Sequence, residues 1–559
     1  RDDGPTFAMV RAARTLGCFQ IESPGQRELV AKLLPRTVGD LVVDISLFRP
    51  GPVGSDMVNP FLDARHGRRP AVFPHPDLEP VLRETQGVVV WHEQVLRVLD
   101  VMTGCGLSDA EGMRRRMSSA EGLEAVGTWF RERADARGYD AATVERVWRT
   151  LAAFGAFGFC KAHAASFALP TYQSAWLKRH HTAAFFAGVL THDPGMYPKR
   201  VILDDARHFG VPILPLDVNR SAALWRVEDG GIRVALTEVR GIGESEVERI
   251  VARRPYASLG DFWRRAHASR PTVERLVLAG GFDALYRGTP VGRRDLLCRV
   301  GALDRASSVR PSAGLVEGQL PLGDAPDGDD GHGGGGLGTP EPGMLEDVPL
   351  GELPPMAPSE IVEAELDILG MDVSRHVISF YGDLLRALGV VPARDLPDRD
   401  KGEEVLVAGV KVATQTPAVR SGQRVIFATL DDATGPVDLT FFESVQDRCA
   451  ATVFGSWLLL ARGRVHKPGF RAASLTASEC WDLGVLDAAW REGGIGAVRR
   501  LMAASGPPRG RPIGRRTTYA SGFAASPYAD VGHAGPQVRR PPAARLWHTS
   551  QGSSGPTDP

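Results

Sequence analysis

Residues 405–412 read VLVAGVKV, and three similar apolar stretches follow them: VIFATL at 425–430, VDLTFF at 437–442 and WLLLARG at 457–463. All four are short and rich in β-branched, aromatic or other apolar side chains. The segment DDATG at 431–435 separates two of them and is typical of a tight turn. Short apolar runs at this spacing favour antiparallel strands, so the sequence predicts a small β-barrel of about five strands.

A change in composition separates this barrel from the rest of the chain. Residues 1 to about 300 carry apolar residues with helical periodicity, which predicts a mostly α-helical structure. Residues 321–366 hold eleven acidic residues and no Lys or Arg, so we expect a flexible linker that cannot bury a core. Between 494 and 559, nine Arg stand against two Asp in a Gly-, Pro- and Ser-rich context, which predicts a basic disordered tail.

Length and composition limit the class of protein. The 559 residues correspond to about three or four domains, and the hydrophobic and charged fractions of 43% and 24% are those of an ordinary globular protein. With a net charge of −1, any nucleic-acid contact must come from local patches. No run approaches the roughly 18 apolar residues that span a bilayer, so no membrane partner is expected. The sequence starts at Arg1 without a signal peptide, and we interpret it as part of a longer polypeptide.

The six cysteines are far apart and form no C-x-x-C pair. This spacing argues against a zinc site or a disulfide framework, and it fits the reducing cytoplasm. We therefore expect a cytoplasmic protein without cysteine-bound metal.

Three consecutive arginines, Arg114, Arg115 and Arg116, lie in the stretch MRRRMS at 113–118. Arginine stays protonated in proteins, and its planar donor fork suits phosphate oxygens. Three adjacent side chains cannot all face water on one side of a helix, so at least one of them points to a specific place. The alternative is a solvated helix face with Glu111 as the partner. The neighbouring motifs favour phosphate.

A rigid turn, FRPGP at 48–52, begins near Arg49. Proline fixes φ and glycine accepts unusual dihedral angles, so the turn is preformed. It either presents an arginine to a ligand or simply ends a helix.

Lys161 and His163 stand near the start of a predicted helix of small residues, after the run FGFC at 157–160. A helix N-terminus has unpaired N–H groups and a partial positive charge, so it suits phosphate. The alternatives are a partly buried, hydrogen-bonded His163 and, for His180 and His181, a solvated helix end. The sequence contains no legible Ser/His/Asp arrangement and no Walker loop.

A helix–hairpin–helix pattern occurs at LTEVRGIG, residues 236–243, before a predicted helix. Its hairpin residues Gly241, Ile242 and Gly243 let backbone amides approach a phosphate without base readout. A second half-motif is expected between 272 and 285. The arginines expected to extend the positive surface are Arg249, Arg253 and Arg254.

Taken in order, these motifs resemble those of the bacterial C-family DNA polymerases, the family of the DNA polymerase III alpha subunit and its error-prone relative. The resemblance extends from residue 6 to about 490 and includes LGCFQIES at 16–23, VVVWHEQV at 88–95, KAHAAS at 161–166 and YQSAWLK at 172–178. HAASF at 163–167 and the endings LWH at 546–548 and GSSG at 552–555 are more similar to the error-prone branch. Cys160 and Ala162 depart from the replicase pattern, which usually has Asn and Ser there.

The resemblance implies a role for each region. The expected domains are α-rich, nucleotide-contacting fingers at 1–215, a tandem helix-hairpin-helix DNA-binding region at 216–300, an acidic linker at 301–358, a helical connector at 359–400, an OB-fold at 401–485, a helix at 486–505 and the disordered tail at 506–559.

The resemblance also implies roles for single residues. In this family the arginine pair of the fingers contacts the triphosphate, and it maps to Arg114 and Arg115. Arg49, Lys161 and His163 complete the expected nucleotide site. The OB-fold binds single-stranded template through a basic groove and aromatic platforms. Its candidates here are Lys411, Arg420, Arg424, Phe427 and Phe441, of which the two phenylalanines could equally be core.

Gln319, Leu320 and Leu322 resemble a sliding-clamp tethering peptide. Gly323 stands where the family pattern prefers an aromatic residue, and the alternative is a plain linker. The partners that follow from the resemblance are primer-template DNA, a dNTP, a sliding clamp and other damage-response polymerase partners.

Family members transfer a nucleotidyl group with palm carboxylates that hold two metal ions. The palm lies upstream of the fingers, and neither Asp2-Asp3 nor Asp398–Asp400 looks like a metal site. We therefore expect no catalytic residue and no metal ligand in this chain, with Mg²⁺ acting only in the complete enzyme. Two hypotheses remain: the C-terminal part of an error-prone DNA-directed DNA polymerase, inactive alone, or a non-catalytic DNA-binding and clamp-tethering module.

Overall fold

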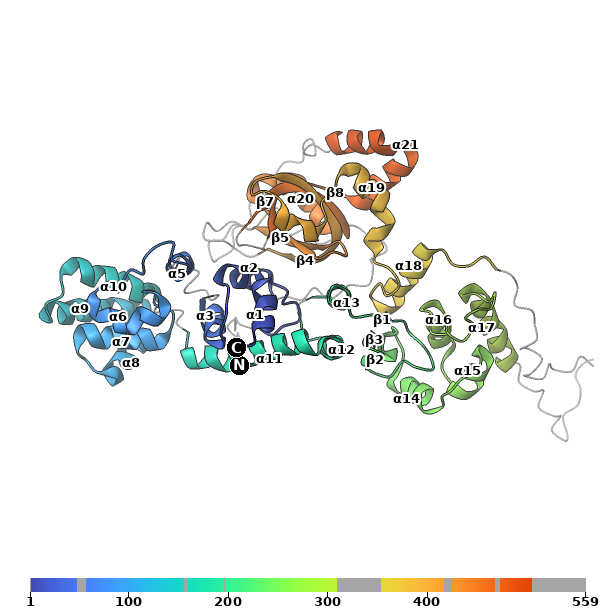
Figure 1. Cartoon of the computed structure of the whole chain (residues 1–559), viewed down its shortest axis with the longest axis horizontal. Coiled ribbons are helices and arrows are strands. Elements are labelled where there is room, and N and C mark those ends of the chain that lie inside the picture. The colour runs from blue at the N-terminus through green and yellow to red at the C-terminus, as the bar shows by residue number, and fades with distance from the viewer. Residues whose placement is uncertain are drawn as a thin grey trace, which may run out of the picture. The chain divides into compact units, whose positions relative to one another are not determined.

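The computed structural model describes residues 2–47, 57–154, 159–195, 197–308, 353–416, 425–467 and 473–504 (Figure 1). These residues form two compact units. The first comprises residues 1–189, 193–209 and 381–559, and the second comprises residues 190–192 and 210–380. The tail at 506–559 and the linker segment 309–352 lie outside the described residues.

Helices α1 (Gly4–Arg11) and α3 (Val38–Leu47) pack along the long helix α11 (Lys161–His180), as Figure 1 shows. Helix α2 (Pro24–Leu33) packs on α1 and α3. The side chains of Asp3 and Ser23 cap the first two helices by accepting hydrogen bonds from backbone N–H groups, which fixes where each helix begins. Phe7 stacks on Tyr172 of α11 with ring centroids 5.7 Å apart. A shared apolar core therefore holds these helices to α11.

A buried lysine anchors the far end of α11. The Lys178 side chain is fully buried, and its Nζ donates to Asp205 Oδ2 and to the Leu16 carbonyl oxygen, both at 2.6 Å. Asp205 belongs to α13 (Lys199–His208), which follows α12 (Thr182–His192). Because a buried charge is tolerated only when it is paired, this ion pair fixes α11 against α13.

A second group of helices in the same unit has its own core. Gly127 of α9 lies against the Trp148 ring of α10, and a Cβ there would come within 2.7 Å of the ring. Helices α9 and α10 can therefore approach closely only with glycine at this position. The elements of this group are α5 (Val58–Arg65), η1 (Pro76–Leu78), α6 (Glu79–Leu82), η2 (Arg83–Thr85), α7 (His92–Thr103), α8 (Leu107–Arg116), α9 (Ala120–Ala136) and α10 (Ala141–Phe154).

The second unit combines a small sheet with a set of short helices. The sheet has the order β1-β3-β2, with β1 parallel and β2 antiparallel to β3. Its strands are β1 (Ile213–Leu214), β2 (Arg226–Glu228) and β3 (Gly231–Arg233). The helical elements are η3 (Leu236–Glu238), α14 (Glu244–Ala252), α15 (Leu259–Ala266), α16 (Arg270–Leu278), α17 (Arg293–Ser308), α18 (Pro358–Leu369) and η4 (Val377–Tyr381).

A closed β-barrel with strand order β4-β5-β6-β8-β7 completes the first unit. Gly409 on β4 faces the Asp431 backbone, where a Cβ would come within 2.6 Å of the carbonyl oxygen, so the strands close only around glycine. Helix α21 packs beside the barrel and is broken at Gly493 and Gly494. The elements are α19 (Gly382–Leu388), η5 (Ala393–Asp398), β4 (Glu404–Gln415), β5 (Ile426–Asp431), β6 (Pro436–Phe441), α20 (Glu443–Gly455), β7 (Leu458–His466), β8 (Ser474–Asp482) and α21 (Leu483–Ala504).

The predicted fold class, helical regions followed by a five-stranded barrel, is confirmed. The three-stranded sheet was not predicted, because strands of two or three residues leave no alternation to detect. Among the described residues, none of the helices combines the length and the apolar character required to cross a bilayer.

Candidate nucleotide and nucleic-acid sites

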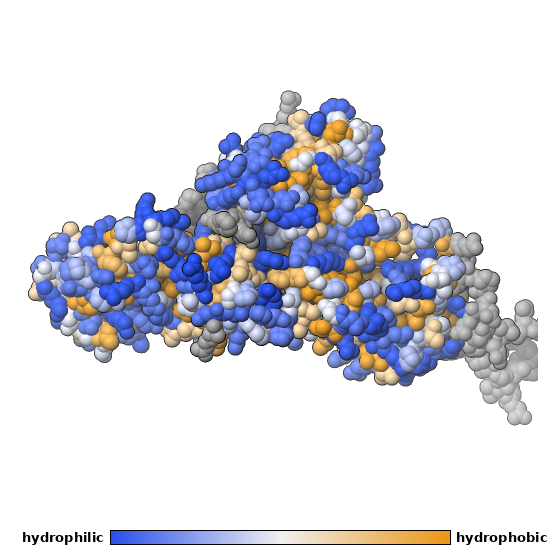
Figure 2. All heavy atoms as spheres, viewed as in Figure 1, coloured by the Kyte–Doolittle hydropathy of each residue, from blue (hydrophilic) through white to orange (hydrophobic). Residues whose placement is uncertain are grey.

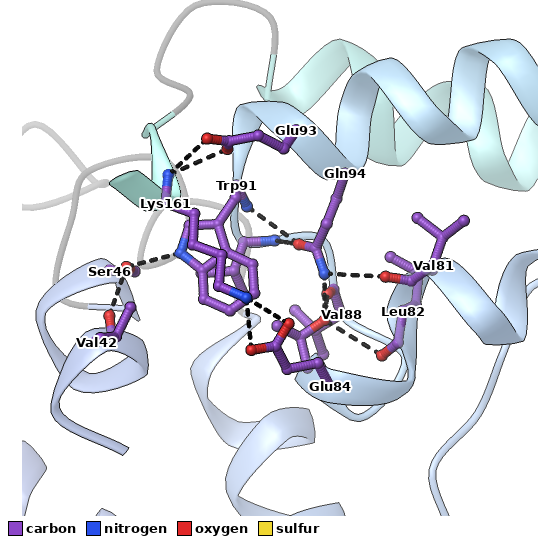
Figure 3. Close-up of polar contacts among 12 residues, drawn as sticks. Val42, Ser46, Val81, Leu82, Glu84, Val88, Trp91, Glu93, Gln94 and Lys161 are labelled. Carbon is purple, nitrogen blue, oxygen red and sulfur yellow. Dashed lines mark hydrogen bonds and ion pairs between the residues drawn. The ribbon is translucent and has the colours of Figure 1, made fainter. Parts of the chain in front are cut away.

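The N-terminus of α11, predicted to receive a phosphate, is bonded to a carboxylate of the chain itself. The two carboxylate oxygens of Glu93 accept from the Lys161 backbone N–H at 3.1 and 3.0 Å (Figure 3). One of them also accepts from the Cys160 thiol at 3.3 Å. Burial works to raise the pKa of Glu93, but these hydrogen bonds outweigh it and hold the pKa below its ordinary value. The helix N-terminus is thus an anion site in which Glu93 is the anion.

The Lys161 side chain is held by a second carboxylate. Its Nζ lies 2.6 Å from both carboxylate oxygens of Glu84 and 4.7 Å from the centre of the Trp91 ring (Figure 3). Trp91 is buried, and its indole N–H donates to Ser46 Oγ at 2.9 Å. The fixed indole therefore gives the ammonium group a defined place, with a cation–π contact beneath it.

Gln94 orders the turn that carries Trp91 and Glu93. Its side-chain oxygen accepts from the backbone N–H groups of Val90 and Trp91 at 2.7 and 3.1 Å, and its Nε2 donates to Thr85 Oγ1 at 2.7 Å. Gln94 is itself buried. This network caps α7 and positions both Trp91 and Glu93 toward Lys161.

Arg114 and Arg115 on α8 share one partner, Glu111. Arg114 donates two hydrogen bonds of 2.8 Å to its carboxylate, and Arg115 donates one of 2.7 Å. These hydrogen bonds lower the pKa of Glu111 to about 2. The Arg115 side chain is 75% exposed and the Arg114 side chain 21%, so the two arginines differ in access to solvent. The contacts are those of the alternative interpretation, in which Glu111 partners the arginine run.

Electrostatics links this arginine run to the start of α11. Burial lowers the pKa of His92, and the charge of Arg114 lowers it further. The hydrogen bonds to Glu111 raise the pKa of Arg114, and the negative charge of Glu93 makes a smaller contribution in the same direction. The structure therefore brings Arg114 and Lys161 to one region through Glu93, which lies at the start of α7. Sequence reasoning had named Glu111 as the alternative partner of the arginine run, but it missed the other two carboxylates, Glu84 and Glu93. Glu93 lies within the quoted WHEQ motif, but nothing in the sequence marked it as a cap.

His163 and Arg49 are the other two residues predicted for the nucleotide site. The His163 side chain is exposed, and its ring meets Phe159 and Phe167 edge-on with centroids 5.2 and 4.3 Å away. It is thus not the partly buried, hydrogen-bonded histidine of the alternative interpretation. Arg49 and the turn at 48–52 lie outside the described residues.

The acidic residues weighed as metal ligands do not fit a two-metal site. Asp3 accepts from Thr6 N and Oγ1 at 2.9 and 2.7 Å and pairs with His180 Nε2 at 2.9 Å, and these contacts lower its pKa to about 2. Asp398 ends η5 and Asp400 follows it in a loop, and both are exposed. Within either compact unit, the described residues gather no three His, Cys or acidic ligands close enough to hold an ion. We therefore derive no metal-dependent step from these residues.

The helix–hairpin–helix has the backbone that its glycines predict. Gly241 has a φ of +76°, a conformation that favours glycine, and Gly243 caps α14. Among the described residues, the backbone N–H groups of Gly241, Glu244 and Ser245 have no acceptor, so they remain available to a phosphate. The Gly243 N–H is instead bonded to Glu246 Oε2 at 3.1 Å.

Arg275 lies beside this hairpin, and the sequence did not indicate it. Its Nη1 lies so close to Gly241 that a Cβ on the glycine would come within 2.7 Å of it. The described part of the chain offers this guanidinium no ion pair. Arg275 comes from α16, 34 positions after Gly241, and no sequence spacing connects the two. It adds a positive charge beside the unpaired hairpin amides.

The three arginines predicted to extend this surface are largely engaged within the unit. Arg249 donates to the His267 carbonyl oxygen at 3.3 Å, and Arg253 donates to the Arg265 carbonyl oxygen, so both cap the end of α15. Arg254 donates to the carbonyl oxygens of Val218 and Ser221. Their charge still contributes to the surface, but their side chains have structural partners.

The barrel residues predicted to bind template lie in different environments: the core, the end of a helix and the surface. Phe441 is fully buried in the barrel core, whereas Phe427 on β5 is 39% exposed. Lys411 donates to the carbonyl oxygens of Val453 and Phe454 at the end of α20, and burial lowers its pKa. Arg420 and Arg424 lie outside the described residues, as do the clamp-peptide residues Gln319, Leu320 and Leu322. The exposed aromatic residues that sequence reasoning did not select are Phe442, Phe454 and Trp457.

Comparison with known proteins gives the family. Residues 1–138 match the model of the bacterial DNA polymerase III alpha subunit finger domain, which includes α7, α8 and the arginine run. Residues 210–296 match the model of a helix-hairpin-helix motif. This chain belongs to the bacterial C-family of DNA polymerases. The resemblance expected from the motifs is confirmed.

Several curated relatives of this C-family chain are named error-prone DNA polymerases. The chain is 35% identical to that of Symbiobacterium thermophilum over 504 residues, which cover 84% of this chain and 45% of the relative. It is 32% identical to error-prone DNA polymerase 2 of Agrobacterium fabrum, covering 86% and 43%. It is 34% identical to the relative of Nocardia farcinica, covering 82% and 39%. The chain therefore spans less than half the length of the curated relatives it matches.

Proposed function

We propose that this chain is the part of an error-prone DNA polymerase that contacts the incoming dNTP and grips the DNA, while the complete enzyme carries out template-directed nucleotidyl transfer. The observation that carries the proposal is the finger-domain match over residues 1–138, which contains Arg114 and Arg115. Similarity to error-prone DNA polymerases over more than four fifths of the chain supports it.

In this proposal, nucleotide binding is an exchange of anions. The groups that would hold a triphosphate are the α11 N-terminus with Lys161 and the guanidiniums of Arg114 and Arg115. In the structure Glu93, Glu84 and Glu111 bind these same groups. A triphosphate carries more charge than any one carboxylate and can take the N–H, ammonium and guanidinium donors together. These residues then bind and orient the triphosphate, and they perform no proton transfer.

The metal-dependent step belongs to the complete enzyme. The proposed cofactor is Mg²⁺, which activates the primer 3′-hydroxyl and stabilises the leaving pyrophosphate in two-metal polymerases. Its ligands are assigned to palm carboxylates that are not among the residues of this chain.

DNA contact is proposed for both units. The unpaired amides of Gly241, Glu244 and Ser245, with Arg275 beside them, suit the phosphates of duplex DNA. Exposed Phe427 and Trp457 on the barrel suit stacking with template bases. A sliding clamp is a further proposed partner, through Gln319, Leu320 and Leu322. Since phosphate contacts release counterions, DNA affinity should fall steeply with salt.

The second candidate function is a non-catalytic DNA-binding or clamp-tethering module. One observation favours it: the hairpin amides are open, whereas the proposed nucleotide groups are all bonded to carboxylates. Under this alternative, the chain should bind DNA, and adding a dNTP should not increase its affinity for DNA.

Primer extension separates the two functions. The proposal expects no extension with Mg²⁺ by this chain alone, and extension by the complete polymerase that contains it. It also expects a complementary dNTP to tighten the binding of primer-template DNA by the complete polymerase. Extension by this chain alone would show that a metal site exists within it. Tight DNA binding without extension in either protein would favour the module.

A further inference from the structure

A cavity of about 400 Å³ lies between the barrel and the last helix, α21. Its polar wall consists of Arg448 from α20, Arg462 from β7, Glu479 from β8 and Arg499 from α21. Leu406 and Met502 contribute to its apolar wall. All of these residues belong to the first compact unit. The volume is that of a typical small-molecule site.

The charges in this cavity are unbalanced. Among the described residues, only Arg462 of the three arginines has carboxylate partners. They are Glu479, with 2.6 Å between Nη1 and Oε2, and Glu404, which is not part of the lining and whose Oε1 lies 4.0 Å from Nε. Its guanidinium also lies 5.3 Å from the centre of the Trp481 ring. Arg448 and Arg499 have no ion pair anywhere in the described part of the chain, and both are exposed. Three guanidiniums against one carboxylate leave a formal charge of +2 on the lining.

The position of Arg499 is built into the fold. Helix α21 is interrupted at Gly493 and Gly494, and the second of these has a φ of +61°, which favours glycine. After this break, Val498 is fully buried and Met502 nearly so. Their burial fixes the second half of the helix against its neighbours and turns Arg499 to the cavity, where Arg462 is held by Glu479 and Trp481.

This arrangement suits a ligand in which a phosphate is attached to a less polar group. Guanidinium forks match phosphate oxygens in geometry and charge, and two of them without partners repel each other until an anion lies between them. The apolar wall of Leu406 and Met502 suits the sugar or base attached to that phosphate. A carboxylate ligand would form fewer hydrogen bonds and a weaker ion pair with the same arginines, because it has fewer oxygens and less charge.

The cavity is separate from Phe427, one of the two aromatic residues proposed above for template binding. Its strands are β4, β7 and β8, whereas Phe427 lies on β5, and neither β5 nor β6 contributes to the lining. In the closed order β4-β5-β6-β8-β7, the cavity therefore occupies the opposite side of the ring from the β5–β6 pair.

We propose that this cavity is a binding site for a phosphate group carried by a nucleotide, either a free mononucleotide or the 5′-terminal nucleotide of a DNA strand. Arg448 and Arg499 hold the phosphate, and Arg462, oriented by Glu479, supports them. The site does not depend on the nucleotide-contacting role of the fingers.

Equilibrium dialysis of this chain tests the site with three probes: dAMP, a 5′-phosphorylated hexathymidylate and the same oligomer with a 5′-hydroxyl. Arg448→Ala and Arg499→Ala are each expected to weaken phosphate-dependent binding roughly tenfold or more. Arg500→Ala is the matched control, because Arg500 is exposed on the same helix and does not line the cavity. It should change binding less than twofold. All variants replace exposed side chains, and thermal melting verifies that they fold.

The probes identify the source of the phosphate. Binding of dAMP that Arg499→Ala removes assigns the site to free mononucleotides, and binding of the phosphorylated oligomer alone assigns it to strand ends. Repeating the dialysis with Arg114→Ala excludes binding at the fingers and keeps this test independent of the proposed function. The proposal is overturned if no probe binds, if the 5′-phosphate makes no difference, or if Arg499→Ala and Arg500→Ala behave alike.

Discussion

Replacing Lys178 by methionine should loosen α11 from the helices around it. The Lys178 side chain is fully buried, with Nζ 2.6 Å from Asp205 Oδ2. At an effective dielectric constant of about 20, two charges at this distance attract by about 6 kcal/mol, part of which desolvation offsets. Methionine keeps the length of the side chain but leaves Asp205 as an unpaired, mostly buried charge. We therefore expect a loss of about 3–5 kcal/mol in the local free energy of unfolding.

Hydrogen exchange of the α11 amides measures this loss directly, because it reports the opening of one segment in a chain with two compact units. A change of about 3 kcal/mol corresponds to exchange roughly 100-fold faster. The matched control is Arg179→Met, which removes the same charge from the next, exposed position of α11. It should change stability by less than about 0.5 kcal/mol. Equal effects of Lys178→Met and Arg179→Met would refute the reasoning, as would failure of Lys178→Met/Asp205→Leu to recover stability relative to Lys178→Met.

Three further outcomes are expected. Glu93→Gln removes the anion at the α11 N-terminus, so the KM for dNTP of the complete polymerase should fall roughly two- to fivefold; a rise would mean that Glu93 serves mainly to orient α11. Gly241→Ala forces a positive φ on alanine beside Arg275, so it should lower the free energy of unfolding by about 1 kcal/mol and weaken duplex binding several-fold in a filter-binding assay. Its control is Gly288→Ala, which has the same backbone strain at φ +83° but no described atom near its Cβ, and which should leave DNA binding unchanged. Asp44 is fully buried and has no hydrogen-bond partner among the described residues, and burial raises its pKa well above the ordinary value, so the folded chain holds a proton that the unfolded chain loses. The free energy of unfolding should therefore fall as the pH rises from the ordinary Asp range to this raised pKa in the native chain but not in Asp44→Asn, and parallel pH profiles in chemical denaturation would contradict this.

The sequence predicted the barrel well because its strands carry strong apolar runs. The quoted runs at 405–412, 425–430, 437–442 and 457–463 overlap β4 to β7. Strand β8 was not located, because SLTASECWD contains small and polar residues that alternate too weakly to stand out. The fifth strand followed only from the expected architecture.

The candidate sites were harder to predict, because their geometry depends on distant segments. Arg114, Lys161 and the hairpin glycines were named from local patterns. Glu111, three positions before Arg114, was also within reach of a local pattern. The distant partners were not, since Glu84 meets Lys161 across 77 positions and Arg275 meets Gly241 through packing of α16. Lys411 was named as a DNA contact because the resemblance implied the basic groove of an OB-fold, and the structure shows that its ammonium group caps α20. A sequence gives the type of charge at a position, whereas only the fold shows what that charge already contacts.

The most direct test of the central claim compares three neighbouring arginines in the complete polymerase. Arg114→Ala, Arg115→Ala and Arg116→Ala remove the same charge within one turn of α8, and Arg116 is exposed without a partner among the described residues. Steady-state primer extension should show the KM for dNTP raised at least tenfold by Arg114→Ala and by Arg115→Ala, and changed less than twofold by Arg116→Ala. Equal KM values for all three variants and the unmodified enzyme would contradict the assignment of a nucleotide site to this region.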